Sequence, residues 1–399
     1  MKSNGHYDVI VVGGGVIGAS IAFELAGKGA TVALIEKHQP ASGASGAAGG
    51  MLAASSEHFA APELYQLALQ SRALYPTLSE RLQALTGIDV GLRTEGFLLP
   101  IHRHTNADWT KDSHHIAEAH AKGMEWWDNT RLAIEEPYVH AEDGMLYNAA
   151  EPQLVPTLLN EAYVAAFARL GGVFYRDHEV IRLLREPDGR GAVQGVLTEQ
   201  RLMYADQVVL ASGLGTARLL TGEGWRLPFL PVKGELLEIR TPLPWLQHTI
   251  FGETVYIIPK HPHRIWIGAT SKPGQYDTTV EAGAIVELLM KAQRYIPMLA
   301  KGELVRCWAG VRPGTPDELP YIGAVDELPG LWIAAGHYRN GILLSAGTAK
   351  LMSEAIAQGN AALIPPAFRP ERALVPLPPA AYAYHHTGIT SGHSIGELE

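Results

Sequence analysis

Cysteine is almost absent from this chain of 399 residues, which contains a single one, Cys307. A lone cysteine excludes an internal disulfide framework and suits a reducing compartment, so we expect a cytoplasmic protein. The sequence also lacks any run of about 18 or more consecutive apolar residues, which excludes a spanning helix of ordinary length. Lys2 and the apolar residues after it resemble a signal peptide, but glycines soon interrupt the apolar run.

Basic residues are outnumbered by acidic ones, with 32 Lys and Arg against 41 Asp and Glu and a formal net charge of −9. This balance argues against nucleic acid as a partner. Charged residues make up 18% of the chain and apolar residues 47%, as is typical of a globular protein with a large interior. A length of 399 residues exceeds what one core usually organises, so we expect two domains.

A nucleotide-binding pattern occupies residues 7–36. It begins with an apolar, β-branched run that predicts a buried parallel strand. Gly13, Gly15 and Gly18 then fill the fixed places of G-x-G-x-x-G before a segment with helical spacing. A second apolar strand ends on Glu36, where a carboxylate can accept hydrogen bonds from a ribose. Strand, glycines, helix, strand and acid in this order predict a bound ADP moiety, with its pyrophosphate at the helix N-terminus.

Strands of the same buried type recur in the middle and near the end of the chain. One at 207–211 leads into Ser212 and Gly213, and another at 331–335 leads into a loop and a helix. Between them lie strand candidates that are joined by proline-rich turns without helices, as in an antiparallel sheet: 236–240, 254–258 and 265–269. This interleaving favours FAD over NAD, because an NAD dehydrogenase usually keeps its dinucleotide unit contiguous.

Two other stretches allow alternative interpretations. Residues 41–51 are nearly all small, which suits either a flexible linker or a loop whose backbone closely approaches a ligand. Their position soon after Glu36 favours the ligand loop. The histidines between residues 101 and 120 match no compact ligand motif, so we interpret them as surface residues and predict no metal site.

Four stretches together carry a family resemblance: 13–18, 231–235, 308–315 and 336–343. Through them, residues 5–360 resemble the D-amino-acid-oxidase-like flavoenzymes, and most closely the glycine oxidases of thiamine biosynthesis. The resemblance implies an α/β fold with an FAD-binding domain of the glutathione-reductase type, built on a Rossmann-like sheet. It also implies an α+β substrate domain with a mixed or antiparallel sheet.

The domains implied by the resemblance are discontinuous in sequence. The FAD-binding domain would comprise residues 1–95, 150–228 and 308–365, and the substrate domain residues 96–149 and 229–307. Residues 366–399 would form a C-terminal tail. The spacing of apolar residues itself predicts helices at 62–86, 154–170 and 280–295.

The resemblance also assigns residues to the cofactor, FAD. Besides the motif glycines, they are Val16, Ile17, Glu36, Lys37, Ala44, Ser45, Gly49, Gly50, Met51, Val180, Gly213, His337, Tyr338, Arg339, Asn340, Gly341, Ile342 and Leu343. The small residues near position 50 would pass beneath the flavin, and the backbone of 337–343 would face its oxygen-bearing edge. N–H donors and a helix N-terminus there would stabilise the anionic reduced flavin.

Four residues are implied at the substrate: Arg312, Tyr256, Arg339 and Ser271. A guanidinium fork pairs with both oxygens of an amino-acid carboxylate, which is the role implied for Arg312. Tyr256 matches a tyrosine of the pocket wall, and Arg339 a second arginine at the flavin edge. Ser271 stands where the glycine oxidases have a methionine, and Ala53 where a glycine is more typical. These departures leave sarcosine and small D-amino acids open as substrates beside glycine.

The implied reaction is FAD-dependent oxidative deamination of a small amino acid to an imine or oxoacid, ammonia and hydrogen peroxide, with dioxygen as the acceptor. No acid–base side chain is required, since hydride moves to the flavin. The alternatives are a D-amino-acid or secondary-amine dehydrogenase that reduces a quinone or a protein, and a non-catalytic dinucleotide-binding module. The relatives form homotetramers, so we expect a homo-oligomer. Cys307 suggests either covalent flavin attachment, as in related sarcosine oxidases, or a small buried side chain in a strand.

Overall fold

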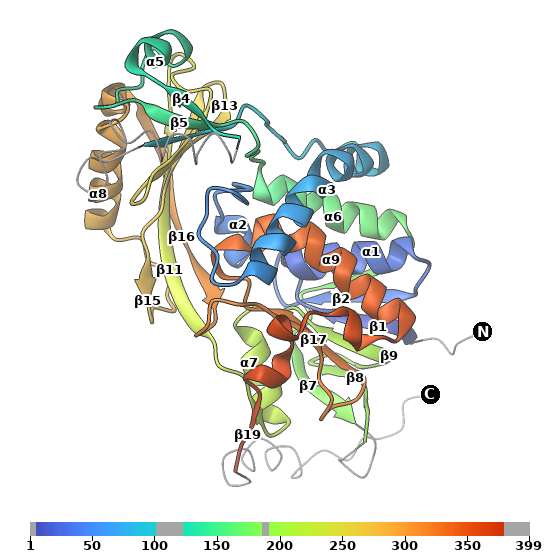
Figure 1. The fold of residues 1–399 in the computed structure, drawn as a ribbon. Coiled ribbons are helices and arrows are strands. Elements are labelled where there is room, and N and C mark those ends of the chain that lie inside the picture. The colour runs from blue at the N-terminus through green and yellow to red at the C-terminus, as the bar shows by residue number, and fades with distance from the viewer. Residues whose placement is uncertain (1–4, 101–122, 186–190, 379–399) are drawn as a thin grey trace.

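The computed structural model describes residues 5–100, 123–185 and 191–378, and it places them around two β-sheets (Figure 1). The first sheet grows from the strand of the nucleotide-binding pattern, β1 (His6–Val12). β1 pairs in parallel with β2 (Val32–Glu36) on one side and with β9 (Leu202–Leu210) on the other. The apolar run therefore forms a central strand, as its lack of alternation predicts.

The rest of the first sheet comes from distant parts of the chain. Its strand order is β17-β18-β9-β1-β2-β6, with β6 at Val173–Arg176, β17 at Tyr321–Ala324 and β18 at Leu331–Ala335. β7 (Val180–Arg185) and β8 (Val193–Thr198) form an antiparallel extension that joins the sheet through β9. All pairings among β18, β9, β1, β2 and β6 are parallel, as in a Rossmann-like sheet.

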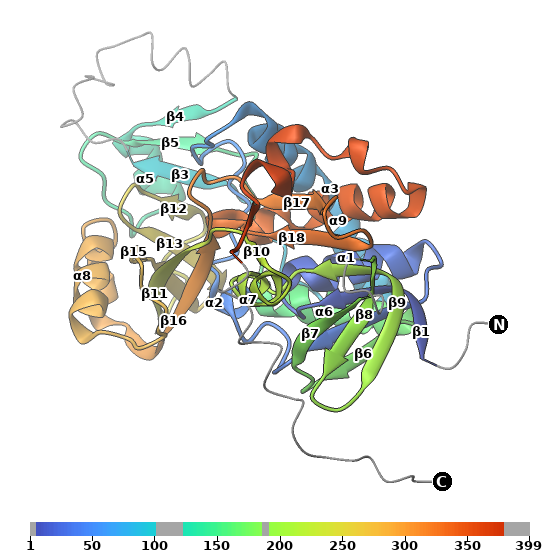
Figure 2. The same ribbon diagram turned by 90° about the horizontal axis from the view of Figure 1, so that it is seen from below.

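Helices cover one face of this sheet (Figure 2). They are α1 (Val16–Gly27), α3 (Pro62–Thr86), α6 (Pro156–Arg169) and α9 (Gly341–Gln358). α1 is apolar around nearly its whole circumference, because it lies among the sheet, α6 and α9. The opposite face of the sheet packs a second apolar cluster with α7 (Gly215–Gly222) and the β7–β8 extension.

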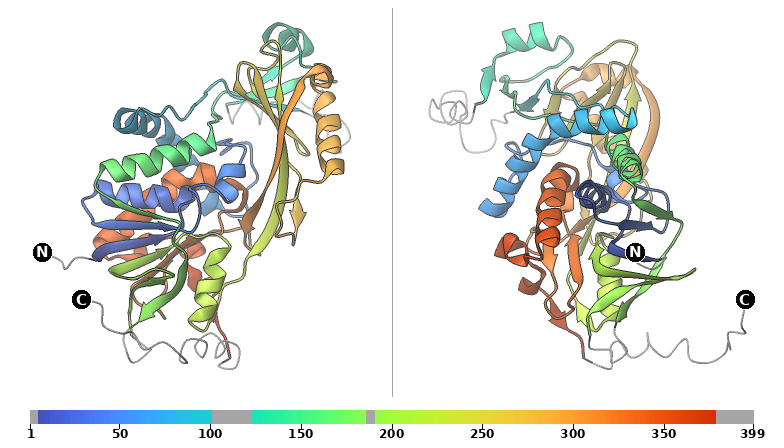
Figure 3. Two further views of the ribbon diagram at one scale, coloured as in Figure 1. Left: turned by 180° about the vertical axis from the view of Figure 1, so that it is seen from behind. Right: turned by 90° about the vertical axis from the view of Figure 1, so that its right-hand side faces the viewer.

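The second sheet is mixed and has the strand order β15-β11-β14-β13-β12-β3-β5-β4, with β16 also paired to β11. Among the pairings of its described strands, only that of β12 with β3 is parallel. The bounds are β3 Phe97–Pro100, β4 Glu125–Trp127, β5 Met145–Asn148, β11 Leu230–Arg240, β12 Thr249–Phe251, β13 Tyr256–His261, β14 Arg264–Gly268, β15 Lys272–Pro273 and β16 Glu303–Gly314. α8 (Ala282–Gln293) packs on its outer side (Figure 3). The predicted α/β fold with two different sheets is confirmed.

Two boundaries differ from the expectation. Residues 308–314 were assigned to the FAD-binding domain, but β16 pairs with β11 from Glu303 to Gly314 and so belongs to the second sheet. Residues 366–376 were assigned to a tail, yet Phe368 is 1% exposed in the first domain's core, and β19 (Val375–Pro376) pairs with β10 (Trp225–Arg226). Neither pairing has a signal in local sequence, since both join segments far apart in the chain.

Most locally predicted elements are present near their expected positions. The helix predicted at 62–86 is α3, and those predicted at 154–170 and 280–295 are α6 and α8. Two short helices, α2 (Ala44–Ala47) and α5 (Asn129–Glu135), were not predicted. The histidines at 101–120 lie outside the described residues. Across the described part of the chain, no helix is both long and apolar enough to cross a membrane.

Candidate functional site

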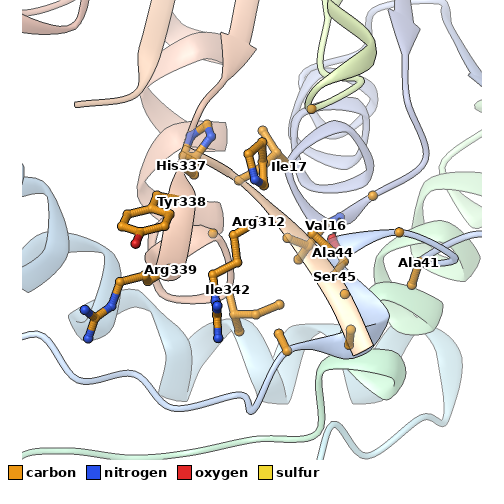
Figure 4. Close-up of a pocket in the computed structure, with 18 of the residues that line it drawn as sticks. Val16, Ile17, Ala41, Ala44, Ser45, Arg312, His337, Tyr338, Arg339 and Ile342 are labelled. Atoms are coloured by element: carbon orange, nitrogen blue, oxygen red, sulfur yellow. Dashed lines mark hydrogen bonds between the residues drawn. The ribbon is translucent and has the colours of Figure 1, made fainter. Parts of the chain in front are cut away.

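A cavity of about 520 Å³ is lined by residues from both sheets. Its wall includes the glycine-rich turn after β1, the small-residue loop at 41–51, and parts of β11, β13 and β16. Its volume falls within the range of about 300–1,000 Å³ that is usual for small-molecule and cofactor sites. Figure 4 shows Val16, Ile17, Ser45 and Arg312 together in its wall.

One part of the cavity is the N-terminus of α1. Gly13 has φ +114°, and a Cβ there would lie 2.5 Å from the carbonyl oxygen of Ala211, so only glycine fits this turn. The Gly14 N–H donates to Oε2 of Glu36 at 2.7 Å, and the Val16 N–H donates to the Ser45 hydroxyl at 3.0 Å. The strand, turn and terminal acid thus meet where a dinucleotide's phosphates and ribose would bind.

The loop at 41–51 folds against the second sheet. A Cβ on Gly310 of β16 would lie 2.4 Å from Cβ of Ala47, and one on Gly49 would lie 3.0 Å from Cδ1 of Ile258. The Trp308 indole N–H donates to the Ala47 carbonyl at 3.2 Å. The small side chains are therefore needed for close packing around the cavity, and the linker interpretation of this loop is wrong.

These features fit FAD. The cavity wall contains the glycine turn, the acid at the end of β2 and the close-packed loop, which form a cradle that larger side chains would fill. His178 also lines the cavity, and its buried Nε2 has no hydrogen-bond partner among the described residues, as a ligand-facing nitrogen would. The residues near α1 and β2 would hold the ADP portion, and the residues shared with the second sheet would hold the flavin.

Arg312 lies on β16 in the part of the cavity formed by the second sheet. Its Nη1 donates to the carbonyl oxygen of Thr270 at 3.2 Å, and it forms no ion pair with any residue that the structure describes. Thr270 is itself fixed, since its hydroxyl donates to Oε2 of Glu235 at 2.8 Å. A guanidinium held by a neutral carbonyl keeps its charge available for a bound carboxylate.

Tyr256 lies close to this guanidinium. Burial raises the pKa of its phenol, while the charges of Arg312 and Arg339 act in the opposite direction. The phenol therefore stays protonated at neutral pH and can donate a hydrogen bond. Space for both side chains comes from glycines: a Cβ on Gly268 would lie 2.6 Å from the Tyr256 ring, and one on Gly234 would lie 2.4 Å from Nη2 of Arg312.

Nearly all residues predicted for the site lie in the cavity wall, and Ser271 and Ala53 lie there as well. Gly18 and Leu343 do not. Gly18 instead allows α1 to contact the turn, since its Cβ would lie 1.9 Å from the Gly13 carbonyl oxygen, and Leu343 is 1% exposed in the core of the first domain. Leu343 is therefore a core residue, because the first turn of α9 directs it away from the cavity.

Cys307 also lies outside the cavity wall. It packs against the apolar core of the second sheet, and burial raises the pKa of its thiol. A thiol that remains protonated in a core is a poor nucleophile, so the structure favours the structural role of Cys307 over covalent flavin attachment.

Glu57 also lines the cavity, with a side chain that is 11% exposed, although no sequence pattern predicted it there. Its carboxylate accepts from Nη2 of Arg339 at 3.0 Å. Burial raises the pKa of Glu57, and the nearby Arg339 and Arg312 act against that shift. Glu57 follows the small-residue loop and belongs to no sequence motif. Among the described residues, its ion pair with Arg339, 282 residues further along the chain, is what marks it as part of the site.

The burial of His337 predicts that the folded protein loses stability as the pH falls. Its side chain is 5% exposed and forms a hydrogen bond with the Thr348 hydroxyl, and burial lowers its pKa to about 3. The unfolded chain takes up a proton on this histidine near pH 6.5 and the folded protein does not. Stability is therefore lost as pH falls from about 6.5 towards 3, by about 2 kcal/mol between pH 7 and pH 5.

The measurement is chemical unfolding at pH 7 and pH 5 with His337→Gln beside the wild type. We expect the variant to lose about 2 kcal/mol less than the wild type over this range. Equal losses in the two proteins would show that His337 is protonated in the folded state as easily as in the unfolded chain.

Replacing Gly234 by alanine is expected to displace the Arg312 side chain. In Gly234→Ala the new methyl group would overlap the Arg312 guanidinium, which is the far end of a flexible side chain and can move away. We expect a folded protein in which KM for a carboxylate substrate rises at least about tenfold, because a displacement of about 1 Å can cost that much. In an Arg312→Ala background the same change should add nothing, and a further loss there would assign the effect to general misfolding.

Comparison with known proteins gives the same picture. Residues 8–355 match the family described as "DAO: FAD dependent oxidoreductase". A glycine oxidase of Geobacillus kaustophilus (strain HTA426) is 41% identical over 361 residues, which cover 90% of this chain and 94% of that protein. A glycine oxidase of Bacillus subtilis (strain 168) is 31% identical over 352 residues, or 88% of this chain and 93% of that protein.

The fold is similar as well. The crystal structure of glycine oxidase from Geobacillus kaustophilus has a TM-score of 0.84 and 39% identity to this chain, and the similarity covers 92% of this chain and 99% of that one. The family match spans both sheets and every segment of the cavity wall. This chain therefore belongs to the DAO family of FAD-dependent oxidoreductases, with FAD as its cofactor.

Proposed function

We propose that this protein oxidises glycine or another small amino acid, such as sarcosine or a small D-amino acid. The observation that carries the proposal is the Arg312 guanidinium. It lines the cofactor cavity and forms no ion pair with any described residue. Two relatives that are similar over most of the chain are glycine oxidases, which favours glycine among these substrates.

The protein's part in this reaction is to bind and orient the substrate. The Arg312 fork would pair with both carboxylate oxygens, which fixes the rotation of the substrate as well as its place. The protonated Tyr256 phenol would donate to the same carboxylate. The exposed Ser271 would border the side-chain region, where its small polar group leaves room for an N-methyl or Cα substituent.

FAD, when bound, supplies the acceptor for the hydride from the substrate Cα. The released imine would hydrolyse to an oxoacid and ammonia, or to an oxoacid and methylamine if the substrate is sarcosine. It could also serve thiamine biosynthesis directly, as the family resemblance implies. His337 is neutral at working pH because burial lowers its pKa to about 3, so its ring adds no positive charge beside the substrate. The chain's residues would thus act through position and charge, without a dedicated acid or base.

The test is a panel of amines incubated with the purified flavoprotein in air, read by hydrogen peroxide formation. We expect glycine, sarcosine or a small D-amino acid to yield one peroxide per imine formed. Anaerobic bleaching of the flavin without peroxide in air would instead indicate a dehydrogenase that reduces a quinone or a protein. No bleaching by any amine would reject the proposed function and leave a dinucleotide-binding module.

Dioxygen as the acceptor, a homo-oligomeric state and a cytoplasmic location complete the proposal. The resemblance to tetrameric relatives supports the oligomer, and the single Cys307 supports a reducing compartment. Light scattering coupled to size-exclusion chromatography would measure the oligomeric state, and a mass of 43.1 kDa would show a monomer instead.

A further inference from the structure

Arg312 and Arg339, two of the arginines that line the cavity, differ in their ion pairing. Arg339, in the 3-10 turn that precedes α9, has Nη2 3.0 Å from both carboxylate oxygens of Glu57. Arg312 forms no ion pair with the described residues, and its Nη1 donates to the Thr270 carbonyl at 3.2 Å. In Figure 4 the Arg339 side chain extends away from Arg312. The carboxylate of Glu57 thus holds one of the two guanidinium groups aside.

Glu57 is fixed in this position by its own backbone. Its N–H donates to the Ala53 carbonyl at 3.2 Å, which closes a turn. The turn is anchored by Glu151, which is fully buried, accepts from the Ala54 N–H at 2.9 Å and pairs with Arg72 at 3.1 Å. The turn thus positions the largely buried Glu57 carboxylate for its ion pair with the half-exposed Arg339.

We propose that Glu57 makes the pocket selective for substrates with a single carboxylate, by neutralising Arg339 and leaving Arg312 as the carboxylate site. This inference rests on the proposed function, since it deepens the role of the same pocket. The structure thereby gives Glu57 the role of a specificity-determining residue.

The charges explain the selectivity. Arg312, Arg339 and Glu57 together carry one net positive charge, which matches one substrate carboxylate. A substrate with a second carboxylate would find Arg339 already paired and would bring its charge close to Glu57, and like charges in a partly buried site are strongly unfavourable. Without the Glu57 charge, two guanidinium groups would face the pocket and could bind both ends of a dicarboxylate.

The experiment compares two ligands that contain no amine and therefore cannot be oxidised as substrates. Methoxyacetate carries one carboxylate, and oxydiacetate has the same ether chain with a second carboxylate. Their dissociation constants are measured on the flavoprotein by titration calorimetry and by the change in flavin absorbance. For Glu57→Gln we expect the ratio of the two constants to shift at least about tenfold in favour of oxydiacetate.

Three further variants identify the cause. Glu253→Gln removes another carboxylate that lines the cavity but forms no described ion pair, so the ratio should stay within about twofold of the wild type. Adding Arg339→Gln to Glu57→Gln should abolish the gain for oxydiacetate. Arg339→Gln alone leaves Glu57 without its cation, and oxydiacetate should then bind at least about tenfold more weakly relative to methoxyacetate.

A ratio unchanged in Glu57→Gln, or shifted equally in Glu253→Gln, would overturn the inference. If Glu57→Gln does not fold, an unchanged ratio in Arg339→Gln would overturn it as well. If the proposed function is wrong, the wild-type protein will form no imine from any amine in the substrate panel. Because binding of these ligands needs no turnover, the two failures are distinguishable.

Discussion

Replacing Arg312 by alanine is expected to lower kcat/KM for glycine by between about 100-fold and several thousand-fold, or about 3–5 kcal/mol. The loss is large because the guanidinium would form two charge-assisted hydrogen bonds with the carboxylate in a partly buried cavity. The other described cations of the cavity wall are not placed to replace it: Arg339 is paired with Glu57 and Arg218 with Glu179 at 2.7 Å, and Lys37 follows the end of β2 in the ADP part of the cavity.

Steady-state kinetics with glycine measures this loss, and flavin absorbance confirms that the cofactor is retained. Arg312→Lys should fall between the wild type and the alanine variant, because it keeps the charge and loses the fork. Arg240→Ala is a matched control, since Arg240 lies at the end of the neighbouring strand and pairs with the exposed Glu303 at 2.9 Å. Wild-type kinetics in Arg312→Ala would remove this residue from the substrate site.

Replacing Gly18 by alanine is expected to produce a protein that contains little or no flavin. A Cβ at this position would lie 1.9 Å from the carbonyl oxygen of Gly13 and 3.3 Å from Cβ of Ala211. These atoms belong to the turn after β1 and to the strand beside it, which cannot move aside as a flexible side chain could. α1 must therefore shift, and its N-terminal N–H groups lose their place at the pyrophosphate.

The flavin-to-protein absorbance ratio and the unfolding midpoint measure this effect. We expect the apoprotein to be destabilised by at least about 1–3 kcal/mol, as overpacking of a core usually costs. Gly283→Ala is the matched control, because Gly283 lies within helix α8 and no described residue would come within 4 Å of an added Cβ. Alanine there should leave the flavin content unchanged and raise stability by about 0.5–1 kcal/mol. Full flavin content in Gly18→Ala would contradict the packing role of Gly18.

The nucleotide-binding half was predictable from the sequence because its signals are local. Strand, glycine turn, helix, strand and Glu36 all lie within residues 7–36, and each conformation follows from its own short pattern. The backbone of this segment has few alternatives, since Gly13 requires a positive φ that other residues rarely adopt. The proposed substrate-binding roles of Tyr256, Ser271 and Arg312 came from family resemblance and not from spacing.

Tertiary structure decided the features that depend on pairing between distant segments. β16 joins the second sheet through hydrogen bonds to β11, and residues 366–376 pack on the first domain, although local sequence gave neither contact. The ion pair of Glu57 with Arg339 spans 282 residues and has no periodic signature. By itself the sequence determined that an ADP-containing cofactor is bound. The ion pairing in the cavity wall was decided only when folding brought these distant side chains within hydrogen-bonding distance.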